Sequence, residues 1–294
     1  MREAAAEVWK RLRAKPLSLA GLGLVAFFAA LAALAPILAP APASSRDPYL
    51  IPQDGYSPDP VRPSRRHLFG TTEQQYDLYY GIVWGARTAF KVGCTVAAVS
   101  LAVGVAMGGL AGFYGGWVDE VLMRATDVIM ALPGIILAVV IVTVRGPGLF
   151  NVMLAIALVH WPSYARLVRA DVLSVRQRDF VLAARSLGAG DARILARHVL
   201  PNSIYPVLVV ASLDIGAVVI TAAALSFLGL GAPPGYADWG QLISLSRNWI
   251  LGSSGSPLAY WHTVAIPGLT IFLFTLGWNL LGDAFRDILD PRQK

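Results

Sequence analysis

Apolar residues gather in six long runs, separated by polar or proline-rich segments. A helix needs about 20 apolar residues to cross the hydrocarbon layer of a bilayer, and each run is close to this length. The runs are continuous rather than alternating, which favours helices over the strands of a membrane barrel. We therefore predict an all-α polytopic membrane protein with six transmembrane helices. The predicted spans are residues 17–39, 89–113, 121–144, 149–168, 204–230 and 262–281.

The first span follows a basic start and precedes a segment, residues 41–43, that is similar to a signal-peptidase site. Its apolar run is longer than the roughly 7–15 residues of a cleaved signal, so we expect a retained helix. The second span carries Gly104, Gly108 and Gly112, and this four-residue spacing predicts close packing against another helix.

Composition supports a membrane protein. Of the 294 residues, 56% are apolar and 14% are charged, whereas a soluble domain carries roughly 25% charged residues. This balance excludes a cytosolic enzyme, a nucleic-acid-binding domain and a disordered scaffold. Cys94 is the one cysteine, so the chain cannot form an internal disulfide or a cysteine metal cluster.

The distribution of Lys and Arg predicts the orientation, because these residues accumulate on the cytoplasmic side. With both termini inside, the inner segments hold about twice as many Lys and Arg as the outer ones. The expected parts are a cytoplasmic N-terminus 1–16, a first span 17–39, an external Pro-rich loop 40–88, a core domain 89–284 and a cytoplasmic tail 285–294. The core contains an inner loop 173–203 and an external loop 231–261.

The inner loop predicts two short helices. Asp179 can cap a helix that runs to Leu187, and Gly188 then breaks it. Asp191 begins a second helix, which Pro201 is expected to end because proline disfavours helical geometry in the residue before it.

Asn202 or Ser203 can then cap the fifth span. Phe180, Ala184 and Leu187 share one face of the first short helix, and arginines surround that face. Such a surface is typical of a helix that docks in a groove of a partner. A basic connector that only maintains topology is the alternative.

The same loop resembles a known family. The segment Ala183-Ala184-Arg185-Ser186-Leu187-Gly188-Ala189-Gly190-Asp191, followed by Arg197-His198-Val199-Leu200-Pro201-Asn202, is similar to the EAA loop of ATP-binding-cassette (ABC) importer permeases. The likeness is strongest to the second permease of dipeptide and oligopeptide systems, the DppC/OppC type. It extends to His67–Thr71, Gly85–Arg87, Asp127 with Leu132-Pro133, Trp239-Gly240 and the tail from Gly282 to Arg292.

Two departures from the family pattern stand out. Leu182 occupies the position of the glutamate that gives the loop its name. Residues 73–77, Glu-Gln-Gln-Tyr-Asp, replace the usual Asp-x-x-Gly-Arg-Asp of the outer stretch. The first departure removes a polar contact that Arg185 could supply instead.

The resemblance implies the type I ABC importer permease fold in a prokaryotic inner or plasma membrane. It also implies four kinds of partner: a homologous second permease, two ABC ATPase subunits, an external solute-binding protein and a peptide cargo. No phosphate-binding GxxxxGK[ST] loop occurs. We therefore expect a non-catalytic subunit that binds no cofactor or metal, with ATP and Mg²⁺ held by the ATPases, and no contact with nucleic acid.

The resemblance also implies which residues carry the function. The residues expected to contact the ATPase are Phe180, Ala183, Ala184, Arg185, Leu187, Gly188, Asp191, Arg193, Ile194, Arg197, His198, Leu200, Pro201 and Asn202. Asp214 lies deep in the fifth span and is a candidate for the translocation path; an interhelical hydrogen bond or a partner contact is the alternative. His160 is a second path candidate, or part of a kink at Pro162. We expect Asp127 to pair with Arg124.

Other functions remain as alternatives. A close relative could import nickel or an oligosaccharide instead of peptides. A proton-coupled secondary transporter would need carboxylates deep in several spans, and Asp214 alone is convincingly placed there. An intramembrane enzyme would need a nucleophile or a metal motif such as HExxH, and none occurs.

Overall fold

A computed structural model describes residues 15–43, 45, 47–250, 256 and 258–289. Most of the predicted N-terminus 1–16, half of the tail 285–294 and part of the external loop 231–261 lie outside the described residues. Within them, the chain forms helices and isolated β-bridges but no strand. The helices are α2 (Pro16–Ala33), α3 (Ala35–Leu38), α4 (Leu78–Tyr114), α5 (Gly116–Met130), α6 (Gly134–Arg145), α7 (Leu149–Val175), α8 (Asp179–Ser186), α9 (Asp191–Ile194), α10 (Leu200–Ser203), α11 (Tyr205–Phe227), α12 (Trp239–Ser244) and α13 (His262–Leu289). A π-helical turn, Leu195–Val199, joins α9 to α10, and 3₁₀ turns form at Glu73–Gln75 and Arg247–Trp249.

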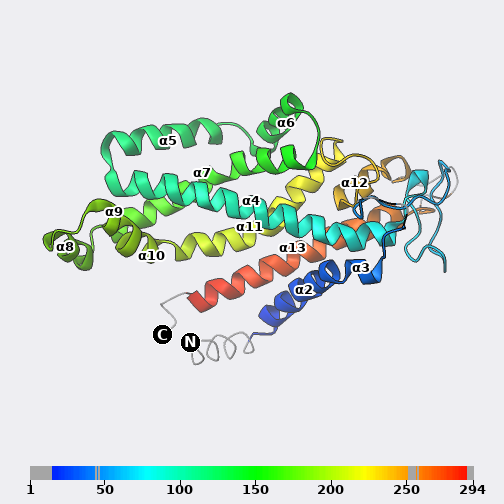
Figure 1. Cartoon of the computed structure of the whole chain (residues 1–294), viewed down its shortest axis with the longest axis horizontal. Helices are drawn as coiled ribbons and strands as arrows, with labels where there is room; N and C mark the ends of the chain where they lie inside the picture. The colour runs from blue at the N-terminus through cyan, green and yellow to red at the C-terminus, as the bar shows by residue number, and fades with distance from the viewer. Residues whose placement is uncertain (1–14, 44, 46, 251–255, 257, 290–294) are drawn as a thin grey trace.

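The long helices run along the long axis of the molecule (Figure 1). Helix α4 packs against α7 and α11, α11 packs against α13, and α13 packs against α2. Helices α8, α9 and α10 lie at one end, and α12 with the long external loop lies at the other. The bundle therefore has two distinct polar ends, as the predicted topology requires.

The predicted number of six spans is not confirmed, because the described helices include four or, counting the bent α5–α6 pair, five candidate spans by length and composition. Four described helices are long and apolar enough to cross a membrane, namely α2, α4, α11 and α13. The third predicted span, 121–144, is not one straight helix: α5 and α6 meet at an angle of 86°. Pro133 precedes α6 and disfavours helical geometry at Leu132, which explains the break. Helix α7 is 27 residues long, but polar residues in its second half lower its hydropathy.

Helix α4 is longer than predicted, because it begins at Leu78 and not at Ala89. The Asp77 side chain accepts a hydrogen bond from the Tyr80 backbone N–H at 2.9 Å and so caps the helix. The first turns are then buried under the external loop, with Leu78 0% exposed. The predicted external loop 40–88 therefore ends at Asp77, since its last part is helical.

The predicted glycine packing face of α4 is confirmed. Gly104, Gly108 and Gly112 lie directly against α7, and a Cβ atom at Gly108 would collide with the backbone of Ala165. Only residues without a side chain allow the two helix backbones to approach this closely. This glycine contact fixes α7, which leads to the predicted inner loop, against α4, the longest helix of the bundle.

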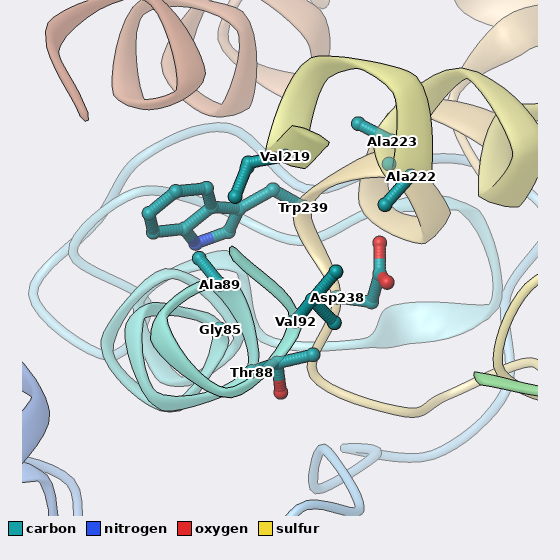
Figure 2. Close-up of a pocket in the computed structure, with 10 residues that line it drawn as sticks. Gly85, Thr88, Ala89, Val92, Val219, Ala222, Ala223, Asp238 and Trp239 are labelled. Atoms are coloured by element: carbon teal, nitrogen blue, oxygen red, sulfur yellow. The ribbon is translucent and has the colours of Figure 1, made fainter. Parts of the chain in front are cut away.

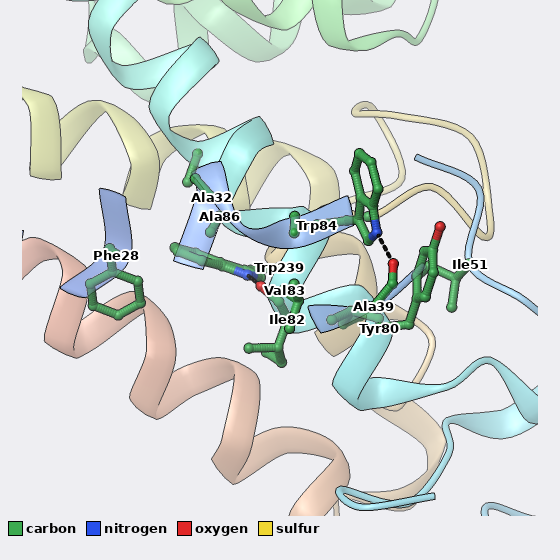
Figure 3. Packing of buried hydrophobic residues seen from close by; sticks show 14 of the residues in the cluster. Phe28, Ala32, Ala39, Ile51, Tyr80, Ile82, Val83, Trp84, Ala86 and Trp239 are labelled. Carbon is green, nitrogen blue, oxygen red and sulfur yellow. Dashed lines mark hydrogen bonds between the residues drawn. The ribbon is translucent and has the colours of Figure 1, made fainter. Parts of the chain in front are cut away.

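An aromatic cluster holds the outer half of the bundle together (Figure 3). Phe28 of α2 packs against Trp239 of α12, with ring centroids 5.8 Å apart. Trp84 of α4 donates a hydrogen bond from Nε1 to the carbonyl of Ala39 at 2.8 Å. The cluster therefore joins the first helix, the external loop and α4 into one packed unit.

Candidate functional site

The coupling segment, residues 173–203, projects from the end of the bundle opposite α12 (Figure 1). Its first helix, α8, ends at Ser186, and Gly188 follows the C-cap residue Leu187 with a φ of +80°. The Gly188 N–H bonds to Arg185 O at 3.0 Å and the Ala189 N–H bonds to Ala184 O at 3.1 Å. This pair of bonds is a Schellman C-cap, which favours glycine at the left-handed position. The predicted break at Gly188 is thus confirmed.

The start of α8 differs from the prediction. Arg178 is the N-cap residue, and its side chain makes no capping hydrogen bond. Asp179 is the first helical residue instead of the cap. Its carboxylate still lies at the positive end of the helix dipole, which it stabilises without a cap bond.

The second helix passes through Pro201, contrary to the prediction that it ends there. The π-helical turn before it has a wider hydrogen bond, from the Leu200 N–H to Leu195 O. A widened turn accommodates a proline ring and its missing N–H, so the chain stays helical.

Asn202 and Ser203 do not cap the fifth span. Asn202 Nδ2 donates to His198 O at 2.6 Å, and Ser203 Oγ donates to Val199 O at 2.9 Å. Both side chains therefore bond backward to their own helix, which competes with the capping role that was predicted.

One face of the coupling segment is packed against the bundle. Val181, Ile194 and Val199 are at most 1% exposed and belong to a core cluster with Val172 and Val175 of α7. These contacts fix α8 and the second helix to the inner end of α7. The two short helices must then move together with α7.

The opposite face presents apolar side chains to solvent. Leu187 is 89% exposed, Leu182 50% and Phe180 40%. Of the remaining predicted contact residues, Ala183, Arg185, Gly188, Asp191, Arg193, Arg197, Pro201 and Asn202 are exposed, Ala184, His198 and Leu200 are half-buried, and Ile194 is buried. Most of the predicted set is thus accessible, whereas Ile194 is buried in the core.

Ion pairs and hydrogen bonds brace this region. Arg185 lies 3.5 Å from Asp191 across the Gly188 break, which links α8 to α9. The Arg176 guanidinium donates to the carbonyls of Gly112 and Phe113, at 2.8 and 3.0 Å. These carbonyls belong to the last turn of α4 and have no helical donor, so Arg176 satisfies them. The sequence analysis missed Arg176, although an arginine just after a membrane helix is a cue for such a cap.

Two further pairs join α7 to α5. Arg169 forms a bidentate pair with Asp119, and Arg166 Nη2 lies 2.6 Å from Asp127 Oδ1. The predicted pairing of Asp127 with Arg124 is therefore wrong. Arg124 lies near Glu120 instead, at 3.8 Å on the same helix, because the i,i+4 spacing places them on one face.

The path candidates His160 and Asp214 are neighbours on α7 and α11. Both side chains are half-buried, and the Asp214 carboxylate acts electrostatically on His160 and on Tyr164. Tyr164, one turn after His160 on α7, was not predicted as a site residue. Its four-residue spacing from His160 was the cue in the sequence.

A small cavity lies near the outer end, between α4, α11 and α12 (Figure 2). Asp238 lines it, caps α12 through the Gln241 N–H at 3.1 Å and accepts a bond from Ser226 Oγ at 3.1 Å. Burial raises the pKa of the Asp238 carboxyl, against the lowering effect of these hydrogen bonds. The cavity wall is otherwise mostly apolar.

Comparison with known protein families identifies the class of membrane protein to which this chain belongs. The profile described as the inner membrane component of binding-protein-dependent transport systems matches residues 104–294. The chain belongs to this family. The N-terminal transmembrane domain of oligopeptide transport permease C also matches residues 5–58. The chain is thus a multi-pass inner-membrane permease component, and not an enzyme, of a system that includes a binding protein and ABC ATPases.

Several named relatives cover most or nearly all of the permease. A dipeptide transport system permease, DppC, of Alkalihalophilus pseudofirmus is 39% identical over 288 residues, 98% of this chain and 90% of the relative. A glutathione transport system permease, GsiD, of Pectobacterium atrosepticum is 38% identical over 98% of this chain and 91% of its own length. A di/tripeptide permease of Pseudomonas aeruginosa is 42% identical over 78% of the chain and 73% of its own length.

A solved structure supports the fold of this permease. A crystal structure of an amino acid ABC transporter with histidines matches with a TM-score of 0.51. It is 18% identical and covers 71% of this chain and 94% of that one. At this identity the likeness concerns the arrangement of helices alone.

Proposed function

We propose that this permease is a membrane subunit of an ATP-driven importer of di- and oligopeptides. The observation that carries the proposal is similarity along almost the whole chain to a dipeptide permease, at 39% identity. Similarity to a di/tripeptide permease points to the same cargo class. The cargo would pass through the bundle, while ATP and Mg²⁺ bind to separate ATPase subunits.

The coupling segment is the proposed contact with an ATPase subunit. Leu187, Leu182 and Phe180 are exposed apolar side chains, and Arg193 and Arg197 of the same segment are exposed as well. An apolar helix face rimmed by arginines suits a groove on a partner. Leu182 makes this contact more apolar than a glutamate would.

The proposed complex contains a homologous second permease as a heterodimer partner, two ATPase subunits and an external solute-binding protein. Six spans with both termini inside fit this assembly if α7 and the bent α5–α6 pair also cross the bilayer. Helix α7 then needs a polar environment along one side, which a path or a partner subunit supplies. His160 and Asp214 are the proposed path residues.

The test is import into proteoliposomes that contain the complete complex and its binding protein. We expect uptake of radiolabelled Ala-Ala that requires ATP and the binding protein and that persists after an uncoupler collapses the proton gradient. Uptake that is lost with the proton gradient but is independent of ATP would indicate a secondary transporter. ATP-driven uptake of nickel or an oligosaccharide without Ala-Ala uptake would reassign the cargo.

A further inference from the structure

Helices α7 and α11 carry a group of ionisable side chains near the middle of the bundle. His160, Tyr164 and Asp171 fall on one stripe of α7. Tyr164 packs in the same core cluster as Ala211 of α11, which lies one turn before Asp214, and the Asp214 carboxylate acts electrostatically on His160 and Tyr164. We call these four residues the acidic seam. His160 and Tyr164 flank the centre of α7, and Asp214 is close to the centre of α11. The seam therefore begins at mid-membrane depth and runs toward the inner end.

The polar groups of the seam lack partners. Within the described part of the chain, neither Asp171 nor Asp214 forms an ion pair. Tyr164 Oη and Asp171 Oδ2 are fully buried and make no hydrogen bond. Leaving such groups unpaired costs free energy, so a polar ligand at the seam is favoured.

Contact between this surface and lipid hydrocarbon is energetically unfavourable. A carboxylate at the centre of a bilayer is energetically costly, so such residues face water or a polar group. Asp214 and His160 are half-buried and thus accessible from one side of the seam. That side must be an aqueous path or a polar contact with another subunit.

The negative charge and hydrogen-bond acceptors of the seam favour a cationic ligand. Carboxylates accept hydrogen bonds and carry negative charge, and an alkylammonium offers three donors and no acceptor. We propose that Asp214, beside His160 and Tyr164, binds the N-terminal ammonium of the peptide cargo during its passage. This inference rests on the proposed function.

Asp171 extends the same idea toward the cytoplasm. It lies seven residues after Tyr164, which corresponds to about 10 Å along a helix axis. A second carboxylate at this distance gives the ammonium another acceptor on its way inward. Asp214 is then the entry acceptor and Asp171 the exit acceptor.

The decisive experiment compares two cargoes in the complete complex in proteoliposomes. Ala-Ala has a free ammonium, and propionyl-alanine has the same shape without it. For each cargo we divide the import rate of Asp214→Asn by that of wild type. The same binding protein delivers the cargo in both assays, so its preference between the two cargoes does not affect this ratio. We expect at least a tenfold loss for Ala-Ala, little change for propionyl-alanine and substantial rescue by Asp214→Glu.

Glu120→Gln is the matched control, since it removes an exposed carboxylate from α5 outside the seam. It should leave both ratios near one. Equal losses for both cargoes in Asp214→Asn would assign a structural role and overturn the proposal, as would unchanged Ala-Ala import. Failure of wild type to import Ala-Ala with ATP would instead refute the proposed function.

A second measurement tests access directly. In the complete complex with Cys94→Ser in this subunit, Asp214→Cys should react with a water-soluble cationic methanethiosulfonate, and Ala-Ala but not propionyl-alanine should slow that reaction. Absence of labelling in every nucleotide state would place residue 214 against lipid or the second permease. That result would overturn the proposal.

Discussion

At the scale of single residues, Gly188 sets the shape of the coupling segment. Its φ of +80° is a conformation that costs a residue with a Cβ roughly 1–2 kcal/mol. Gly190, two residues later, has an ordinary φ of −70° and is the N-cap of α9. No atom lies within 4 Å of a Cβ added at either glycine, so backbone geometry alone distinguishes them.

This difference predicts the effect of adding the same charge at each position. Gly188→Asp should lower the amount of peptide imported per ATP hydrolysed, because it strains the turn between α8 and α9. Gly190→Asp should retain coupling, since Asp is a favourable N-cap residue. Import and phosphate release are measured on the same proteoliposomes; equal behaviour of the two variants would contradict a geometric role for Gly188.

Residue-scale predictions from sequence succeeded where one local rule acts alone. The Schellman cap at Gly188 follows from glycine after a short helix. Pro201 was predicted to end the helix, but the wider π-helical turn before it leaves room for the proline ring, so the helix continues. That outcome depends on packing of Val199 and Ile194 against α7, which no local pattern encodes.

At the scale of elements, α8 has two faces with different tasks. Val181 is 1% exposed and fixes the helix to α7, whereas Leu187 is 89% exposed. A change on the first face acts through folding, and a change on the second acts through the partner. The sequence analysis assigned Phe180 and Leu187 to one exposed face, but could not show which side of α8 the bundle covers.

Alanine substitutions should separate these tasks. Leu187→Ala should weaken retention of ATPase subunits by the purified permease pair without changing its melting temperature. Val181→Ala should lower the melting temperature, because removal of two buried methyl groups costs roughly 1–2 kcal/mol. Co-purification and thermal unfolding in detergent measure the two effects. A melting temperature lowered equally by both changes would show that Leu187 is not a free docking residue.

At the scale of the whole molecule, the two polar ends should face opposite sides of the membrane. In a Cys94→Ser background, Tyr56→Cys lies in the external loop and Ser186→Cys lies at the end of α8. Tyr56 is 79% exposed, so its replacement is accessible to a reagent. An impermeant maleimide should label residue 56 in spheroplasts but residue 186 only after permeabilisation. The reverse pattern would invert the topology and exclude the coupling assignment.

The pattern of apolar runs predicted the helical class, and the motifs of residues 183–202 carried the family resemblance, which the family comparison confirms. The apolar pattern could not predict that α4 begins at Leu78, because the buried outer turns depend on contacts with residues far along the chain, such as Ala39 and Trp239. The bend before Pro133 and the pairing of Asp127 with Arg166 likewise depend on tertiary packing. Charge partners across helices are set by the bundle and not by sequence spacing.

The uninterrupted length of α4 has a mechanical consequence. At 1.5 Å per residue, its 37 residues make a rod of about 55 Å. One end of the rod is capped by Asp77 within the external loop, and Arg176 binds the other beside the coupling segment. A stiff helix that reaches both ends converts a small tilt at one end into a displacement at the other. In the proposed complex, the binding protein and the ATPase subunits would therefore act on the same helix.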